Sequence, residues 1–364
     1  MNKKKVLIMN LTPRGGMLHY SSQFCNELMK RNDIELKVGI ASYHDGSLYD
    51  HSTSFIKIRT NPNPLSFVFD SLNIFYHLYF LFQIIVFRPQ VVHFLDNHPW
   101  YILYAPIFKC IGMTLYVTQH DPVLHSGEDS SLLGKISIQV NKTLRNISDQ
   151  IMVHGDILKK QVIENYNVPE NKILSIRHGS YTFFNTWAQG LAVKKNTFLF
   201  FGRIVDYKGL DVLLESLEYI SHNIPDFKLI IAGPGDISKY SKLIKKYSDN
   251  IELYNFEILP ENAYRYFEVS EFVVLPYKDA SGTGVVPVAY CFEKPVIVTD
   301  VGELPSVVQE NETGSIIIPS DPKTLGEKIV EFLEQKDRVV QMGKQAKKWS
   351  DRELSWKDII KSIY

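Results

Sequence analysis

Short apolar runs alternate with amphipathic stretches along the whole chain. The runs have the length of buried strands, and stretches between them, such as residues 18–31, place apolar side chains at helical spacing. The expected strands are residues 5–9, 35–40, 90–94, 113–118, 150–153, 197–201, 227–232, 271–275 and 295–299. Near-continuous apolar strands separated by helices indicate parallel sheets covered on both faces, so the sequence predicts an α/β fold.

The alternation weakens between residues 181 and 196 and divides the pattern into two β/α units. We therefore expect two Rossmann-like, doubly wound domains at residues 1–185 and 186–345, followed by a final helix at 346–364. In the second domain, Asp321 and Pro322 predict the start of a helix. Ligands of open α/β sheets bind at the carboxyl ends of the strands, and two facing sheets would place a cleft between the domains.

One stretch stands out by its lack of charge. The 17 residues between Asp70 and Arg88 carry no formally charged side chain, which is just short of the ~20 residues that span a bilayer. Asn73, His77 and Gln83 interrupt the run. We expect a mostly buried helix whose aromatic residues are core, with a helix that touches a membrane surface as the alternative.

Composition excludes several classes of protein. The 364 residues carry 40 Lys and Arg against 40 Asp and Glu, which argues against a nucleic-acid binder that works by neutralising phosphates. Residues 1–190 hold 18 basic and 14 acidic residues, a formal +4, together with ten of the eleven histidines. Three distant cysteines without a C-x-x-C pair exclude a disulfide framework and a zinc ribbon, and no export signal is apparent, so we expect a cytoplasmic protein.

The loop at residues 201–209 is the first candidate for chemistry. Arg203 offers a planar fork of donors and Lys208 a compact cation, both just before a helix whose N-terminal amides favour an anion. This combination suits a diphosphate, although taken alone the loop is equally compatible with an ordinary solvated surface.

Two further turns suit an anion. Residues 280–285 follow a predicted strand and combine glycines, which allow close backbone approach, with the hydroxyls of Ser281 and Thr283. A glycine pair, Gly15 and Gly16, opens the first helix. Three such loops in two β/α units predict one phosphorylated ligand.

These motifs together resemble glycosyltransferase family 4. The resemblance rests on G-R-x-x-x-x-K-G at 202–209, A-G-P-G at 232–235, K-P-V-I-V-T-D-V-G at 294–302, H-D-P-V-L-H at 120–125 and R-H-G at 177–179. It covers essentially the whole chain and implies a GT-B fold with two facing domains, a retaining enzyme, a nucleotide-sugar donor and a final helix that returns to the first domain.

The resemblance implies roles for individual residues. Arg203 and Lys208 would grip the donor diphosphate and stabilise the leaving group without a metal, and the chain has no Asp-x-Asp pair. His120 would lie near the reacting sugar carbon, with His125, His154 and His178 either contacting a substrate or serving the fold. The full set expected at the donor is Gly15, Gly16, Arg203, Lys208, Gly233, Phe256, Ser281, Gly282, Thr283, Gly284 and Val285.

The chain departs from the family at one place. Many members carry two glutamates eight positions apart, and the corresponding positions hold Ala280 and Val288. Asp279 is expected to replace the first, and nothing replaces the second, so the ribose contacts and the donor stay open. The Ser/Thr-Gly turn instead resembles a branch of bacterial surface-polysaccharide glycosyltransferases.

The expected function is hexosyl transfer from a nucleoside diphosphate sugar to a glycan or polyprenyl-linked glycan, on the inner side of the cytoplasmic membrane. No cofactor, metal or nucleic-acid partner is expected. A nucleotide-sugar epimerase of the same fold and a non-catalytic nucleotide-sugar-binding subunit are the alternatives.

Overall fold

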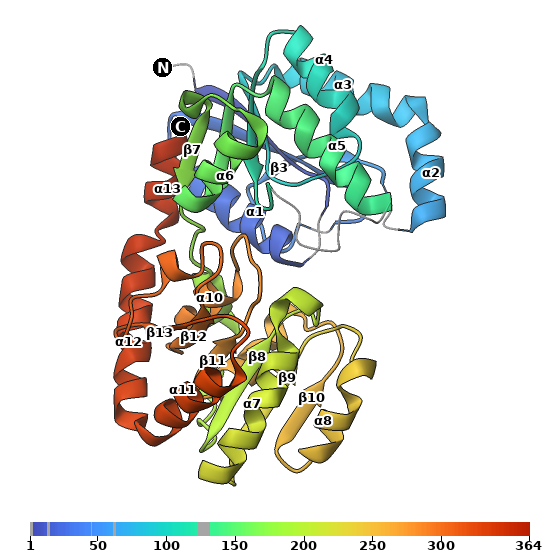
Figure 1. Cartoon of the computed structure of the whole chain (residues 1–364). Helices are drawn as coiled ribbons and strands as arrows, with labels where there is room; N and C mark the ends of the chain where they lie inside the picture. The colour runs from blue at the N-terminus through green and yellow to red at the C-terminus, as the bar shows by residue number, and fades with distance from the viewer. Residues whose placement is uncertain (1–2, 13–14, 45, 61–62, 123–131) are drawn as a thin grey trace. The chain divides into compact units, whose positions relative to one another are not determined.

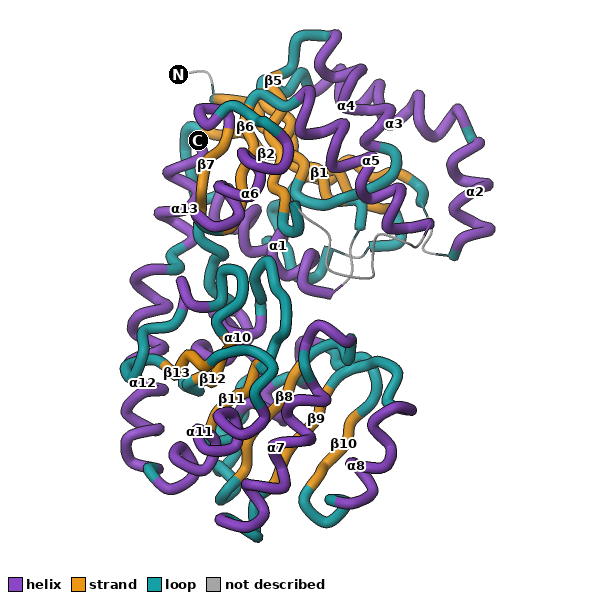
Figure 2. Tube along the Cα trace, viewed as in Figure 1, coloured by secondary structure: helices purple, strands orange, loops and turns teal. Residues whose placement is uncertain are grey.

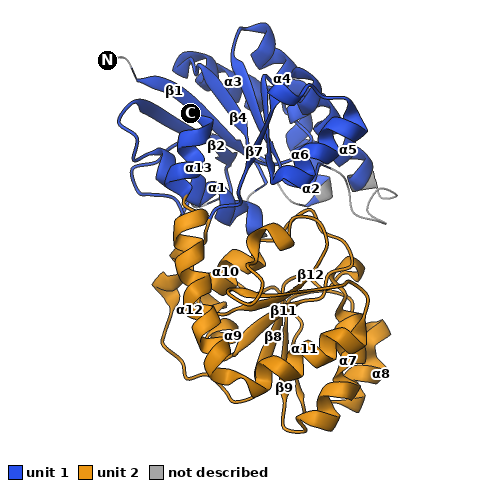
Figure 3. Ribbon diagram, turned by 60° about the vertical axis from the view of Figure 1, so that its left-hand side comes forward, with its two compact units in different colours: residues 1–179, 356–364 blue, residues 180–355 orange. Residues whose placement is uncertain are grey.

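The computed structural model describes residues 3–12, 15–44, 46–60, 63–122 and 132–364, so His125 of the expected site lies outside the described residues. The chain divides into two compact units (Figure 3). Unit 1 comprises residues 1–179 together with 356–364, and unit 2 comprises residues 180–355. The boundaries expected from the sequence were residues 185 and 345.

Unit 1 is built on a parallel sheet of seven strands in the order β3-β2-β1-β4-β5-β6-β7, whose edge strands β3 and β7 are labelled in Figure 1. The strands are β1 (Lys4–Asn10), β2 (Ile34–Ala41), β3 (Ser54–Ile58), β4 (Val91–Phe94), β5 (Thr114–Gln119), β6 (Gln150–His154) and β7 (Ile173–Ile176). The helices are α1 (Gly15–Leu28), α2 (Pro64–Leu72), α3 (Ile74–Phe87), α4 (Tyr101–Cys110), α5 (Leu132–Ile147), α6 (Asp156–Tyr166) and α13 (Trp356–Ile363).

Both faces of this sheet are buried, as the inner strand β1 shows. Leu7 and Met9 pack in one core with helices α3 to α6, whereas Val6 and Ile8 pack in another with α1 and α13. Because successive side chains of a strand point to opposite faces, a strand buried on both sides must be apolar throughout.

Unit 2 repeats the architecture with six parallel strands in the order β10-β9-β8-β11-β12-β13 (Figure 2). The strands are β8 (Thr197–Phe201), β9 (Lys228–Ala232), β10 (Ile251–Tyr254), β11 (Phe272–Leu275), β12 (Val296–Thr299) and β13 (Gly314–Ile317). The α-helices are α7 (Leu210–Asn223), α8 (Ser241–Lys246), α9 (Tyr264–Phe267), α10 (Val285–Cys291), α11 (Pro322–Glu334) and α12 (Lys336–Glu353). The prediction of two Rossmann-like parallel-sheet domains is confirmed.

The predicted start of α11 is confirmed in detail. The Asp321 carboxylate accepts hydrogen bonds from the backbone N–H groups of Lys323 and Thr324, at 3.0 and 3.1 Å. Pro322 stands at the first helical position, where its missing N–H costs nothing.

The expectation of a mostly buried helix at residues 71–87 is wrong. Of the 14 residues of α3, only His77, Phe80, Ile84 and Phe87 are buried, and Phe75 is 78% exposed. One face of α3 packs on the sheet while the rest carries apolar side chains outward. In the described part of the chain no single helix is long and apolar enough to cross a bilayer, whereas α2 and α3 taken together have the length and composition but are bent by 65°.

Helix α13 completes the core of unit 1. The Trp356 ring packs edge-on against Tyr20 and Phe24 of α1, with ring centroids 5.0 and 6.0 Å apart. Gly179 lies under this indole, because an ideal Cβ there would be 2.2 Å from Trp356 Cε2. Only glycine leaves room for Trp356 at this position.

Candidate functional site

The loop that follows β8 carries both expected cations of unit 2. It leaves the strand through Gly202, at φ +108°, and ends at Gly209, at φ +69°, which begins α7. Gly209 is held against the end of β11, because an ideal Cβ there would lie 1.9 Å from the Pro276 carbonyl oxygen. In addition, the Lys278 N–H donates to the Tyr207 carbonyl at 2.7 Å. The loop and the segment after β11 therefore form one surface of unit 2.

Lys208 folds back over this loop. An ideal Cβ on Gly202 would be 2.8 Å from its Nζ, and the ammonium lies 5.1 Å from the centroid of the Tyr277 ring. A cation over a ring face is attracted by the ring electrons. Within the described ranges Lys208 has no carboxylate partner, and Arg203, which is exposed, has none either.

Neighbouring lysines differ in this respect. Lys239 forms an ion pair with Asp206 of the same loop, and Lys278 pairs with Asp211 in the first turn of α7. The local carboxylates are thus used by other cations. This distribution leaves the positive charge of Arg203 and Lys208 available for an anionic ligand.

The turn at residues 280–285 lies beside the same tyrosine. The Thr283 hydroxyl accepts a hydrogen bond from the Val285 N–H at 3.1 Å and lies 3.5 Å from the Tyr277 hydroxyl. Ser281 is buried, and its carbonyl accepts the Glu303 N–H at 3.2 Å. Tyr277 thus contacts Lys208 on one side and this turn on the other, which brings the two predicted anion loops together within unit 2.

The glycines of the predicted site have different surroundings. An ideal Cβ at Gly233 would be 2.1 Å from the Gly202 carbonyl oxygen, so Gly233 supports the loop after β8. At Gly284 it would be 3.0 Å from the Tyr181 ring. Gly282 is exposed and has open space at the Cβ position, so the protein itself does not demand glycine there. A ligand that approaches the backbone closely at this position would require glycine.

The positions of the two missing glutamates are buried in unit 2. Ala280 and Val288 are each 6% exposed and belong to the core beneath β11 and β12. Asp279 is half-buried next to the turn, Val285 is partly exposed at the start of α10, and Phe256 is exposed after β10. Because these two family positions hold alanine and valine, neither carries a carboxylate.

In unit 1, His120 follows β5 and is held by two hydrogen bonds. Its Nε2 lies 3.0 Å from the Leu95 carbonyl oxygen, and its Nδ1 lies 3.0 Å from His154 Nε2. A carbonyl only accepts, so Nε2 carries the hydrogen, and in the neutral ring Nδ1 must accept from His154. Burial lowers the pKa of His120, while Asp121 raises it. Both ring nitrogens are thus occupied within the fold.

Tyr20 of α1 lies at the centre of a histidine cluster. Its ring contacts those of His120, His154 and His178, with centroids 4.7, 5.2 and 5.2 Å apart. Burial lowers the pKa of His178 to about 4 and that of His154 well below its usual range, with further lowering from the other histidines. The cluster is neutral near pH 7. Gly15 and Gly16 start α1, and Gly16 has open space at its Cβ position.

Sequence reasoning missed Tyr277. Nothing in the sequence singles it out among 20 tyrosines, and its role depends on the fold, which brings Lys208 and Thr283 to its two sides.

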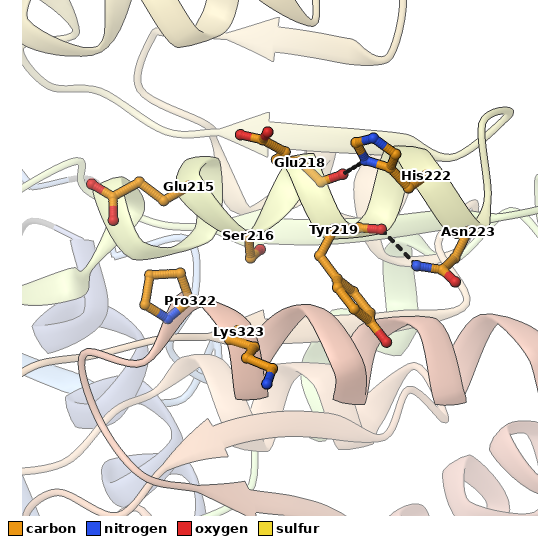
Figure 4. Close-up of a pocket in the computed structure, with 8 residues that line it drawn as sticks. All are labelled: Glu215, Ser216, Glu218, Tyr219, His222, Asn223, Pro322 and Lys323. Carbon is orange, nitrogen blue, oxygen red and sulfur yellow. Dashed lines mark hydrogen bonds between the residues drawn. The ribbon is translucent and has the colours of Figure 1, made fainter.

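A hollow between α7 and the start of α11, where Tyr219 lies, is lined by no predicted site residue (Figure 4). Among the described residues no group of three or more His, Cys, Asp or Glu side chains is arranged to hold a metal ion.

The sequence is similar to known glycosyltransferases. Residues 183–349 match the family model described as glycosyl transferases group 1. An uncharacterized glycosyltransferase of Methanocaldococcus jannaschii is 29% identical over 273 residues, which is 70% of each chain. The capsular polysaccharide biosynthesis glycosyltransferase CapM of Staphylococcus aureus is 25% identical over 59% of this chain and 60% of its own.

Two solved structures share the fold of the whole chain. Sucrose-phosphate synthase from Thermosynechococcus elongatus has a TM-score of 0.76 at 17% identity, covering 99% of this chain and 97% of that one. HepE of Anabaena, solved in complex with UDP-glucose, has a TM-score of 0.70 at 14% identity, covering 99% and 98%. With two parallel-sheet domains of the GT-B fold and a group 1 domain at residues 183–349, the chain belongs to glycosyltransferase family 4.

Proposed function

We propose that this glycosyltransferase is a retaining hexosyltransferase that uses a nucleoside diphosphate sugar and needs no metal for the leaving group. The observation that carries the proposal is the pair of cations in the loop after β8. Arg203 and Lys208 have no carboxylate partner in the described ranges, and their loop is packed against the hydroxyl- and glycine-bearing turn at residues 280–285.

The chemistry follows from these charges. As the bond between the sugar and the diphosphate breaks, negative charge grows on the leaving phosphate, and fixed cations stabilise that charge more than the ground state. The resemblance to glycosyltransferase family 4 implies retention, in which the acceptor hydroxyl attacks the sugar carbon from the face that the diphosphate leaves, and the departing phosphate oxygen accepts the proton of that hydroxyl. His120 has a positioning role in this scheme, because both of its ring nitrogens already make hydrogen bonds within unit 1. Asp279 lies beside the turn and is assigned to the sugar.

The acceptor we propose is a glycan, free or attached to a polyprenyl lipid, in surface polysaccharide synthesis on the cytoplasmic side of the membrane. The capsular polysaccharide relative supports the polysaccharide, and the exposed apolar side chains of α2 and α3 support the lipid.

A thermal-shift panel of nucleoside diphosphate sugars tests the donor. The true donor is expected to raise the melting temperature of the parent, since a ligand bound only by the folded state stabilises it by roughly 2.7 kcal/mol at a hundredfold excess over Kd. The same donor should shift Lys208→Ala much less. Retention is checked by the anomeric configuration of the product in NMR. Stabilisation without transfer to any acceptor, or a free isomerised sugar nucleotide, would contradict the proposal.

A further inference from the structure

Helices α2 and α3 lie at the edge of unit 1 (Figure 1), and many of their apolar side chains are exposed. Eleven of their large apolar side chains are between 48 and 78% exposed, and they include the four most exposed among the described large apolar residues of the chain. We call this surface the apolar elbow; it consists of Leu65, Val68, Phe69, Leu72, Ile74, Phe75, Leu78, Tyr79, Phe82, Ile85 and Val86. Soluble monomers rarely expose so many contiguous apolar side chains without a partner.

The apolar elbow is a folded element. At its inner side Trp100 stacks on Phe67 of α2 with centroids 5.5 Å apart, and its Nε1–H donates to the Ser71 hydroxyl at 2.9 Å. Asn63 caps α2 by accepting from the N–H groups of the first turn, and Asn73 caps α3 in the same way. The bend and the outward orientation of the apolar side chains are therefore built into unit 1.

Charge is almost absent from the surface and present at its end. Asp70 is the only Asp, Glu, Lys or Arg in residues 64–87; it is buried, and its Oδ1 lies 3.1 Å from Nε of Arg59. At the far end of α3, exposed Arg88 ends the helix and Lys37 Nζ lies 4.9 Å from the Phe87 ring centroid. This order, an apolar surface followed by two cations without a carboxylate partner among the described residues, matches a lipid interface with its acyl chains and phosphate headgroups.

The dimensions fit one leaflet. At 1.5 Å per residue, the 14 residues of α3 extend about 21 Å and the nine of α2 about 14 Å, and the two are bent by 65°. Neither helix reaches across a hydrocarbon core of about 30 Å. A bent, charge-poor pair of this size can lie in the interface with its outer side chains among the acyl chains.

We infer that the apolar elbow docks this protein on a bilayer by inserting into one leaflet, with Arg88 and Lys37 at the headgroups. The surface belongs to unit 1 alone and needs neither donor nor acceptor. The link between docking and a lipid-linked acceptor rests on the proposed function. Docking would hold the enzyme at the membrane, where such an acceptor is found.

Vesicle flotation with the full-length protein tests the inference. The parent should float with phosphatidylcholine vesicles, float more completely when phosphatidylglycerol is added, and stay bound at high salt, since insertion of apolar groups is not screened. The double variant Phe75→Glu with Phe82→Glu should lower the partition coefficient at least about tenfold, because each change removes apolar contact and places a charge among acyl chains.

The matched control is Ile318→Glu with Val340→Glu, which makes the same chemical change at two residues of unit 2 that are 60 and 53% exposed. It should float like the parent. Both double variants are also compared by circular dichroism, thermal unfolding and donor-induced stabilisation, so a folding defect or a failed donor assignment is distinguished from lost docking. Parent protein that ignores both kinds of vesicle overturns the inference, as does binding only to anionic vesicles that high salt abolishes. A parent dimer that ignores vesicles and becomes monomeric in the Phe75 and Phe82 variant would assign the surface to a second copy.

Discussion

Gly190 and Gly209 share nearly the same φ, +67° and +69°, yet only Gly209 lies against a neighbour. At Gly190 an ideal Cβ meets nothing within 4 Å, whereas at Gly209 it would lie 1.9 Å from the Pro276 carbonyl oxygen. Substituting alanine at Gly190 therefore tests the cost of a left-handed backbone alone. The same substitution at Gly209 adds a steric clash in the loop of Arg203 and Lys208.

Gly209→Ala should destabilise unit 2 far more than Gly190→Ala. The control carries only the strain of alanine at positive φ, about 1 kcal/mol, whereas Gly209→Ala must also move the loop away from Pro276. We expect a further loss of at least about 2 kcal/mol in the free energy of unfolding, measured by thermal or urea denaturation. Equal losses in the two variants would show that the contact with Pro276 is not tight in solution.

Removing either cation of the loop after β8 should impair transfer more than folding. Arg203→Ala and Lys208→Ala are each expected to lower kcat/KM about a hundredfold or more, because each removes charge stabilisation from the leaving diphosphate. Lys328→Ala is the control, since Lys328 is paired with Glu331 along α11. Activities of both loop variants within a few-fold of the parent would sink the assignment of the diphosphate site.

His93 should make the stability of unit 1 depend on pH. It is fully buried, with Nδ1 2.8 Å from the Tyr364 hydroxyl and Nε2 2.9 Å from the Thr118 hydroxyl. Burial, and secondarily His120, lowers its pKa from 6.5 to about 3. Between these two values the unfolded chain holds a proton that the native ring lacks, so the free energy of unfolding falls as pH falls, by about 1.4 kcal/mol per pH unit.

The measurement compares parent and His93→Gln by urea denaturation at about pH 6 and about pH 5, below the ordinary histidine pKa. The parent should lose about 1.4 kcal/mol more than His93→Gln over this unit of pH. His222→Gln, at an exposed histidine of unit 2, serves as control and should follow the parent. Parallel pH profiles for the parent and His93→Gln would contradict the assignment of a neutral, buried ring.

Gly179→Ala should displace Trp356 and loosen α13. The added methyl would lie 2.2 Å from the indole, so the ring must leave its contact with Tyr20, and we expect a loss of roughly 3 kcal/mol, comparable to deletion of a buried aromatic side chain. Gly112→Ala is the control, because Gly112 has open space despite its φ of +85°. The readouts are the near-ultraviolet circular dichroism of tryptophan and the melting temperature, and the idea fails if both variants retain the parent spectrum.

The strands that the sequence did not predict all lie at the edges of the two sheets. They are the four edge strands β3, β7, β10 and β13, whose burial is interrupted, as in the wholly half-buried β10. The nine predicted strands coincide with the inner strands, where burial on both faces demands continuous apolar residues. A continuous apolar run thus indicates a strand with a neighbouring strand on each side, and edge strands lack such a run.

The site was less predictable than the fold for a different reason. Residue type and loop position were enough to single out Arg203 and Lys208, but their freedom from carboxylates depends on Lys239 and Lys278 pairing elsewhere. In α3, hydrophobicity alone could not distinguish burial from exposure. The outward direction of Phe75 depends on which face of the helix meets the sheet.

The return of residues 356–364 to unit 1 has a consequence for synthesis of the chain on the ribosome. Trp356, Ile359, Ile360 and Ile363 fill a core lined by residues made at the very beginning. All 176 residues of unit 2 must be translated before these side chains emerge, which takes roughly 10 to 35 s. Through that interval Tyr20 and Phe24 of α1 lack the packing partners that α13 supplies in the finished chain.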